Sequence, residues 1–110
     1  MAFDDRLAIR VRDVLAEVPD VSERRMFGGL AFLVGGHMAC GIVGRDLMLR
    51  LGEAGADAAL DRPHVRPMDF TGRPIRTMVY VAGEGIVADS ALRRWLERAV
   101  EYVRALPPKT

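Results

Sequence analysis

Two residues that can bind a metal ion or act as a nucleophile, His37 and Cys40, stand three positions apart in the sequence. A closed zinc site needs four ligands, and only a fold that added His64 and Asp69 would supply the other two. A nucleophilic cysteine needs a base nearby and a lowered pKa, whereas the apolar residues 38–42 are typical of a sheet interior. We therefore expect a turn histidine and a buried thiol, with no catalytic residue, no metal and no cofactor.

Glycine pairs at 28–29 and 35–36 raise a second possibility, because glycine-rich loops can hold phosphate groups. They fit neither the Gly-x-Gly-x-x-Gly nor the Walker pattern, and no strand, glycine loop and helix follow one another in that order around them. We interpret both pairs as hairpin turns, in which glycine readily adopts positive φ angles.

Arginine side chains form the one group that favours a binding site. Arg24 and Arg25 open the first expected strand, and further arginines, Arg62 among them, lie in or beside a proline-rich stretch at 61–74. Loops on a rigid scaffold often carry binding residues, and guanidinium groups suit carboxylate or phosphate. The candidate binding residues are Arg24, Arg25, Arg66, Asp69, Arg73 and Arg76. The alternative is that Arg73 and Asp69 form a structural ion pair that pins the loop.

Composition limits the class of protein. The chain has 110 residues, half of them apolar, which fits one domain over 1–110 with one hydrophobic core. A net charge of +1 argues against an extensive contact with nucleic acid. The single cysteine gives no disulfide framework, and the charged N-terminus is no secretory signal. No apolar run approaches the roughly 20 residues that span a bilayer, so we expect a soluble cytoplasmic protein without a membrane partner.

The elements that must position these residues follow from periodicity. Apolar residues at 3, 7, 11, 14 and 18 predict a helix over about 3–18, ended by Pro19. Short apolar runs between glycine turns predict antiparallel strands at 24–27, 30–34, 38–43 and 47–51. Alternation puts Met38, Cys40 and Ile42 on one face. The other face is also small or apolar, which favours a covering loop or a homodimer.

The rest of the chain continues this pattern. A short alanine-rich helix is expected at 52–60, an ordered loop at 61–74 and a strand at 75–82. The last helix runs to Leu106, with Asp89 or Ser90 as its cap and Arg98 able to pair with Glu101. The expected fold is α+β: two layers, a mostly antiparallel sheet of about five or six strands, and helices at both chain ends in the order α-β(3-4)-α-β(1-2)-α.

Several short motifs in this order resemble the N-terminal domain of the TfoX/Sxy family, over nearly the whole chain. They are Arg24-Arg25-Met26-Phe27-Gly28-Gly29, Phe32, Met38-Ala39-Cys40-Gly41, Leu47-x-Leu49-Arg50, Pro67-Met68, Gly72-Arg73-Pro74, Trp95 and Leu106-Pro107-Pro108-Lys109. The resemblance implies a two-layer fold like that of type III secretion chaperones, and it supplies no catalytic residues. Full-length relatives regulate competence in bacteria together with a transcription activator and carry a second, helical domain. This chain stops after the first, so the resemblance predicts a stand-alone domain and does not extend the competence role to it.

Three functions remain open at this point. The first is a non-enzymatic regulatory or protein-interaction module that meets a protein partner or itself through its sheet and the arginine-containing loop. The second is a small-molecule or anion-binding domain centred on the loop 62–76. Direct DNA binding comes third, because the charges of both long helices are nearly balanced and no DNA-reading motif is visible.

Overall fold

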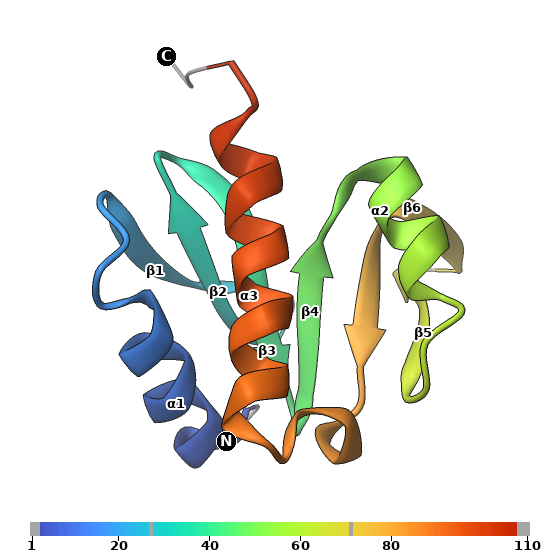
Figure 1. Ribbon diagram of the computed structural model, residues 1–110, viewed down its shortest axis with the longest axis horizontal. Coiled ribbons are helices and arrows are strands. Elements are labelled where there is room, and N and C mark those ends of the chain that lie inside the picture. The colour runs from blue at the N-terminus through green and yellow to red at the C-terminus, as the bar shows by residue number, and fades with distance from the viewer. Residues whose placement is uncertain (1–2, 27, 71, 108–110) are drawn as a thin grey trace.

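A computed structural model describes residues 3–26, 28–70 and 72–107, and leaves the side chains of Phe70, Arg73 and Pro74 outside the description. The described elements form one six-stranded antiparallel sheet in the order β1-β2-β3-β4-β6-β5, with three α-helices and one short 3-10 helix (Figure 1). In chain order they are α1 (Asp5–Leu15), β1 (Val21–Met26), β2 (Gly29–Val34), β3 (His37–Val43), β4 (Asp46–Arg50), α2 (Gly52–Ala59), β5 (Val65–Phe70), β6 (Arg73–Val81), η1 (Gly83–Ile86) and α3 (Asp89–Arg104). This α+β architecture confirms the predicted fold class.

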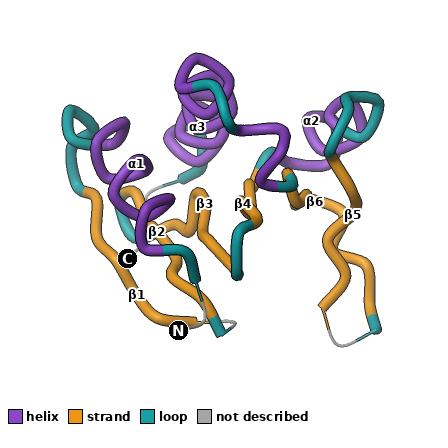
Figure 2. The backbone as a smooth tube through the Cα atoms, turned by 90° about the horizontal axis from the view of Figure 1, so that it is seen from below, coloured by secondary structure: helices purple, strands orange, loops and turns teal. Residues whose placement is uncertain are grey.

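The three α-helices lie on one side of the sheet, and no described helix covers the other side (Figure 2). Strands β1 to β4 form a meander of hairpins, and α2 then carries the chain past β4 to the edge. Strand β5 is that edge, and β6 returns between β5 and β4. The sheet therefore has a helical face and a face that we call the helix-free face.

The main hydrophobic core lies between the sheet and the helices. Cross-strand partners share a face of a sheet, so register assigns each residue to a layer. One row of partners runs Leu30–Ile42–Leu47–Val81 across β2, β3, β4 and β6, and all four side chains are buried against residues of α1 and α3. Leu92, Leu96, Ala99 and Val103 supply the buried stripe of α3, as the helical periodicity predicts.

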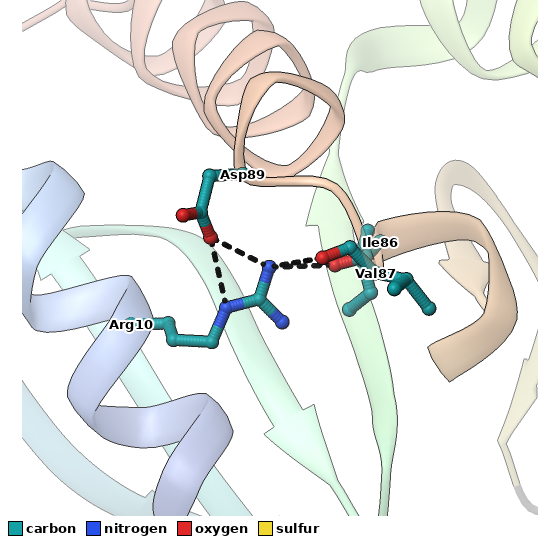
Figure 3. A network of polar contacts seen from close by, with 4 residues as sticks. All are labelled: Arg10, Ile86, Val87 and Asp89. Atoms are coloured by element: carbon teal, nitrogen blue, oxygen red, sulfur yellow. Dashed lines mark hydrogen bonds and ion pairs between the residues drawn. The ribbon is translucent and has the colours of Figure 1, made fainter.

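A single arginine joins the start of α3 to α1. The Arg10 guanidinium donates from Nη2 to the carbonyl oxygens of Ile86 at 2.7 Å and Val87 at 3.2 Å, and reaches Asp89 Oδ1 at 3.1 Å (Figure 3). Asp89 is therefore used in an ion pair and not as a cap. The N-cap of α3 is Ala88, without a side-chain hydrogen bond, so the prediction of Asp89 or Ser90 as the cap was wrong.

Residues 61–74 are not one loop, which corrects the sequence prediction. Residues 65–70 form β5, paired along β6, and β6 begins at Arg73. The prolines misled the prediction because they suit an edge strand that needs few donors, and β5 is such an edge. The register slips between Pro67 and Met68, where β5 takes partners four residues apart along β6.

A bulge in β3 overturns the predicted alternation. Phe32 pairs with Cys40, but its neighbour Leu33 pairs with Met38, so Ala39 is an extra residue in the ladder. Met38 therefore joins the helix-free face, while Ala39 and Cys40 are buried in the main core. Simple period-two counting had placed Met38 beside Cys40.

Of the two predicted glycine turns, the structure confirms the one at Gly35-Gly36 and only part of the other. Gly35 and Gly36 have φ angles of 58° and 86° between β2 and β3, which confirms the predicted turn. Between β1 and β2, Gly28 has a φ of 71°, as expected of a turn, but Gly29 already belongs to β2. Phe27 lies outside the described residues.

Candidate functional site

A continuous row of side chains crosses the helix-free face from one edge of the sheet to the other. Register pairs each member with the next across all six strands, so the six residues share a face. We call it the Arg24–Arg66 row: Arg24, Ala31, Gly41, Met48, Tyr80 and Arg66. It carries a cation at each end and small or apolar residues between them, which is a pattern that suits a protein contact.

The centre of this face is packed by methionines. A Cβ at Gly41 would collide with the terminal methyl of Met48, so the methionine side chain fills the space that glycine leaves open. Met48, Met68 and Met78 are buried in a second, smaller hydrophobic cluster. Methionine is flexible and polarizable, and it is common at surfaces that adapt to a partner.

The exposed part of the face is a rim around that buried centre. Met38, Val43, Ile75 and Tyr80 are partly buried against the methionine cluster and keep part of their surface in solvent. The predicted apolar second face therefore exists, but much of it is already packed within the chain. What remains for a partner is a set of half-exposed apolar side chains between charged ones.

Arg66 is held rigidly at one end of the row. Its Nη2 donates to Asp46 Oδ2 at 2.6 Å, and its guanidinium carbon lies 4.6 Å from the centroid of the Tyr80 ring. An arginine that stacks on an aromatic ring loses little further freedom when it binds a partner. Half of the Arg66 side chain stays exposed, so its remaining N–H donors are accessible.

Arg24 marks the other end of the row, on the edge strand β1. It is exposed and forms no ion pair with any residue in the described ranges. Arg50 adds a third cation on this face, since it shares the orientation of Met48, and its Nη1 lies 3.5 Å from the Met38 carbonyl oxygen. With Asp46 as the acidic member, the helix-free face carries an excess of positive charge.

Three other predicted binding residues, Arg25, Arg76 and Asp69, do not belong to this row. Arg25 points to the helical face, where it lies 5.7 Å from the centroid of the Phe3 ring. Arg76 is exposed and lines a small hollow of about 210 Å³ with the acidic residues Glu53 and Asp57 of α2. Asp69 is exposed near the end of β5. Arg66 and Arg76 therefore have different surroundings, one beside Tyr80 and the other beside the acidic residues of α2.

Arg73 occupies the first position of β6, opposite Phe70 in the hairpin. Its side chain lies outside the described part of the structure, so the choice between a binding role and an ion pair with Asp69 stays as the sequence left it.

Cys40 is buried in the main core, and burial raises the pKa of its thiol to about 12. A thiol in that environment stays protonated and is a poor nucleophile at neutral pH. The nearby histidine points elsewhere: His37 Nε2 lies 2.8 Å from the carbonyl oxygen of Pro107. Within the described residues, no group of three or more His, Cys, Asp and Glu side chains is placed to hold a metal ion.

The alignment of Gly41, Met48 and Tyr80 on one face was not predicted from the sequence. Their separation along the chain hides their alignment, which depends on strand order and register. The one signal available was Tyr80 in a β-rich segment, four residues after Arg76 and before a glycine turn.

Comparison with known proteins gives one match. A family described as TfoX N-terminal domain matches residues 13–103, which is most of the chain. No curated protein sequence and no solved structure matches this chain. Among the described helices, none is long and apolar enough to cross a membrane.

Proposed function

The chain belongs to the TfoX N-terminal domain family, and on this premise we propose that it is a non-enzymatic regulatory module that works by contacting another protein in the cytoplasm. The family is associated with regulators of competence and is of a regulatory type. A module of this kind needs a surface that its own fold leaves accessible, and the helix-free face meets that need.

The observation that carries the proposal is the Arg24–Arg66 row. Its two end cations lie on a face that no described helix covers, where Met38, Val43, Ile75 and Tyr80 stay half-exposed around buried methionines. Arg66 is already ordered by Asp46 and Tyr80. Aromatic, methionine and arginine side chains are the residue types enriched in protein interfaces. Of the predicted binding residues, Arg24 and Arg66 are the ones we assign to this contact.

The charge of the face defines the partner's chemistry. Arg24 and Arg50 have no acidic partner among the described side chains, so a segment that carries carboxylates beside one or two apolar anchors would complement the face. A second copy of the chain is the competing occupant, and it would have to place its own acidic residues on this face.

Photo-crosslinking tests the proposal in the cell. Tyr80 is replaced by benzoylphenylalanine, which keeps an aromatic ring beside Arg66, next to one end of the row. We expect one adduct of defined mass from position 80, and Arg24→Glu in the same chain should reduce its yield at least severalfold, because it reverses a charge at the contact.

Arg94 supplies the matched control, since it is exposed on α3 in the helical layer. Benzoylphenylalanine at position 94 should give no such adduct, and Arg94→Glu should leave the yield from position 80 unchanged. Adducts from position 94 alone, or no adduct from either position, would contradict the proposal. An adduct with the mass of two copies of the chain would identify the partner as the protein itself.

A further inference from the structure

A cleft of about 550 Å³ lies between α2 and α3 in the helical layer, on the side of the sheet opposite the Arg24–Arg66 row. Its volume falls in the range of small-molecule sites. The α2 wall is made of small residues, Gly55, Ala58 and Ala59. Tyr102 of α3 and Ala105, directly after α3, form the facing wall. Apolar atoms dominate this part of the lining, so it suits the apolar body of a ligand.

The position of Tyr102 in the wall of the cleft depends on a glycine at the start of α2. Gly52 begins α2 with a φ of 78°, and a Cβ there would lie 3.1 Å or less from several atoms of the Tyr102 ring. The aromatic ring thus packs directly on the glycine backbone, which fixes the position of the facing wall. A larger residue at position 52 would displace Tyr102 and change the shape of the cleft.

Two arginines give the cleft a charged end. Arg62 and Arg98 both line it, and their guanidinium carbons lie 5.7 Å and 5.1 Å from the centroid of the same indole ring, that of Trp95. A guanidinium group beside an aromatic ring keeps its charge and can still donate N–H groups to an anion. Neither arginine forms an ion pair with a residue that the structure describes.

Glu101 also lines the cleft, so the charged lining residues are two cations and one anion. The predicted pairing of Arg98 with Glu101 does not occur, because the guanidinium group lies by Trp95 instead. The net positive charge fits a ligand with one negative group, held at the Trp95 end.

We propose that the cleft between α2 and α3 binds a small organic monocarboxylate, with Arg62 and Arg98 on the carboxylate and the walls of α2 and α3 on its apolar body. This site is separate from the proposed protein contact on the helix-free face, and neither depends on the other. The predicted anion-binding stretch 62–76 contributes to it through Arg62, which precedes β5.

The protein carries its own reporter for this site, because Trp95 is the only tryptophan in the chain. Octanoate and 4-phenylbutyrate are the probes, one aliphatic and one aromatic, followed by the indole N–H signal of Trp95 in NMR spectra and by its fluorescence. We expect saturable binding of at least one probe. Octanamide, which has the same apolar body without the charge, should bind about tenfold more weakly.

Variants locate the binding. Arg62→Gln and Arg98→Gln should each raise the Kd about tenfold, because each removes a charge-assisted contact, while Arg94→Gln on the same helix should leave it unchanged. Ala58→Leu changes an exposed position of α2 and should block the cleft without unfolding the protein. Failure of both carboxylates to bind, or equal binding by the wild type and the Arg98→Gln variant, would overturn the proposal.

Discussion

At the scale of single residues, neighbours decide what a side chain can do more than its type does. Cys40 is the simplest example. Its spacing from a histidine makes it a candidate metal ligand or nucleophile in the sequence, but its side chain is buried in the main core. Arg24 and Arg25 are adjacent in sequence and serve opposite faces of the sheet. Only the first is available to a partner on the helix-free face.

The first prediction concerns the reactivity of Cys40. A thiol reagent such as dithionitrobenzoate should label it at the rate of unfolding in native protein at pH 8, and at once in denaturant, because burial blocks access and raises the pKa of the thiol to about 12. The raised pKa also means that the unfolded thiol ionises first, so this residue lowers stability as pH rises from 9.0 toward 12. Rapid labelling of the native protein would contradict its burial.

The second prediction concerns the ion pair between Arg12 of α1 and Glu23 of β1. Two hydrogen bonds of 2.7 and 2.8 Å join the groups, and the hydrogen bond from Arg12 lowers the pKa of Glu23. The pair therefore stabilises the fold above the ordinary glutamate pKa, and that contribution is lost as pH falls through the lowered value.

Glu23→Gln tests it by chemical denaturation at several pH values. Both side chains are partly exposed, so the loss at pH 7 should be only about 0.2–1 kcal/mol. The difference from wild type should shrink toward pH 3. Glu17→Gln is the control, because Glu17 is exposed between α1 and β1 and forms no ion pair with a described residue. It should show no such pH-dependent difference.

At the scale of elements, hydrogen bonds and ion pairs join helix α1 to distant parts of the chain. The long helix α3 begins without a side-chain cap, and Arg10 of α1 instead holds the turn before it. Two of its three partners are backbone carbonyl oxygens, and the shorter contact, at 2.7 Å to Ile86, is partly buried. The start of α3 is thus fixed by tertiary contact more than by its own sequence.

The third prediction follows from that contact. Arg10→Met should lower the free energy of unfolding by about 1–3 kcal/mol, because it leaves the partly buried Ile86 carbonyl oxygen without its charged donor. Asp89→Asn should cost less, since the Asp89 side chain is 93% exposed and its ion pair is screened by solvent. Thermal and denaturant unfolding measure both, and equal losses would show that the ion pair, and not the carbonyl contacts, carries the stability.

At the scale of the whole molecule, the sheet separates two surfaces with different chemistry. The helix-free face presents cations at both ends of a row that spans all six strands, whereas the helical layer encloses clefts beside α3. A partner protein and a small ligand could occupy the two sides at once. The rigid, well-packed sheet between them would keep each surface in place.

The fourth prediction belongs to the helix-free face. Once the partner is identified, the Kd of its complex should rise as NaCl is raised from 50 to 300 mM, because exposed charges are screened over roughly 10 Å at 0.1 M salt. Arg24→Gln should weaken the complex at low salt and make the Kd less dependent on salt. A salt dependence equal to that of the wild type would exclude Arg24 from the contact.

The sequence by itself determined the fold class, the glycine turn at Gly35-Gly36, the buried stripe of α3 and the family, because local periodicity and turn chemistry are written in neighbouring residues. Only the tertiary structure decided which side chains meet. The bulge at Ala39 moved Met38 to the other face, and β6 took its place between β4 and β5. Register and strand order are set by long-range packing across the whole sheet, so the alignment of Arg24 with Arg66, and of Arg62 with Arg98 on Trp95, could not be seen in the chain alone.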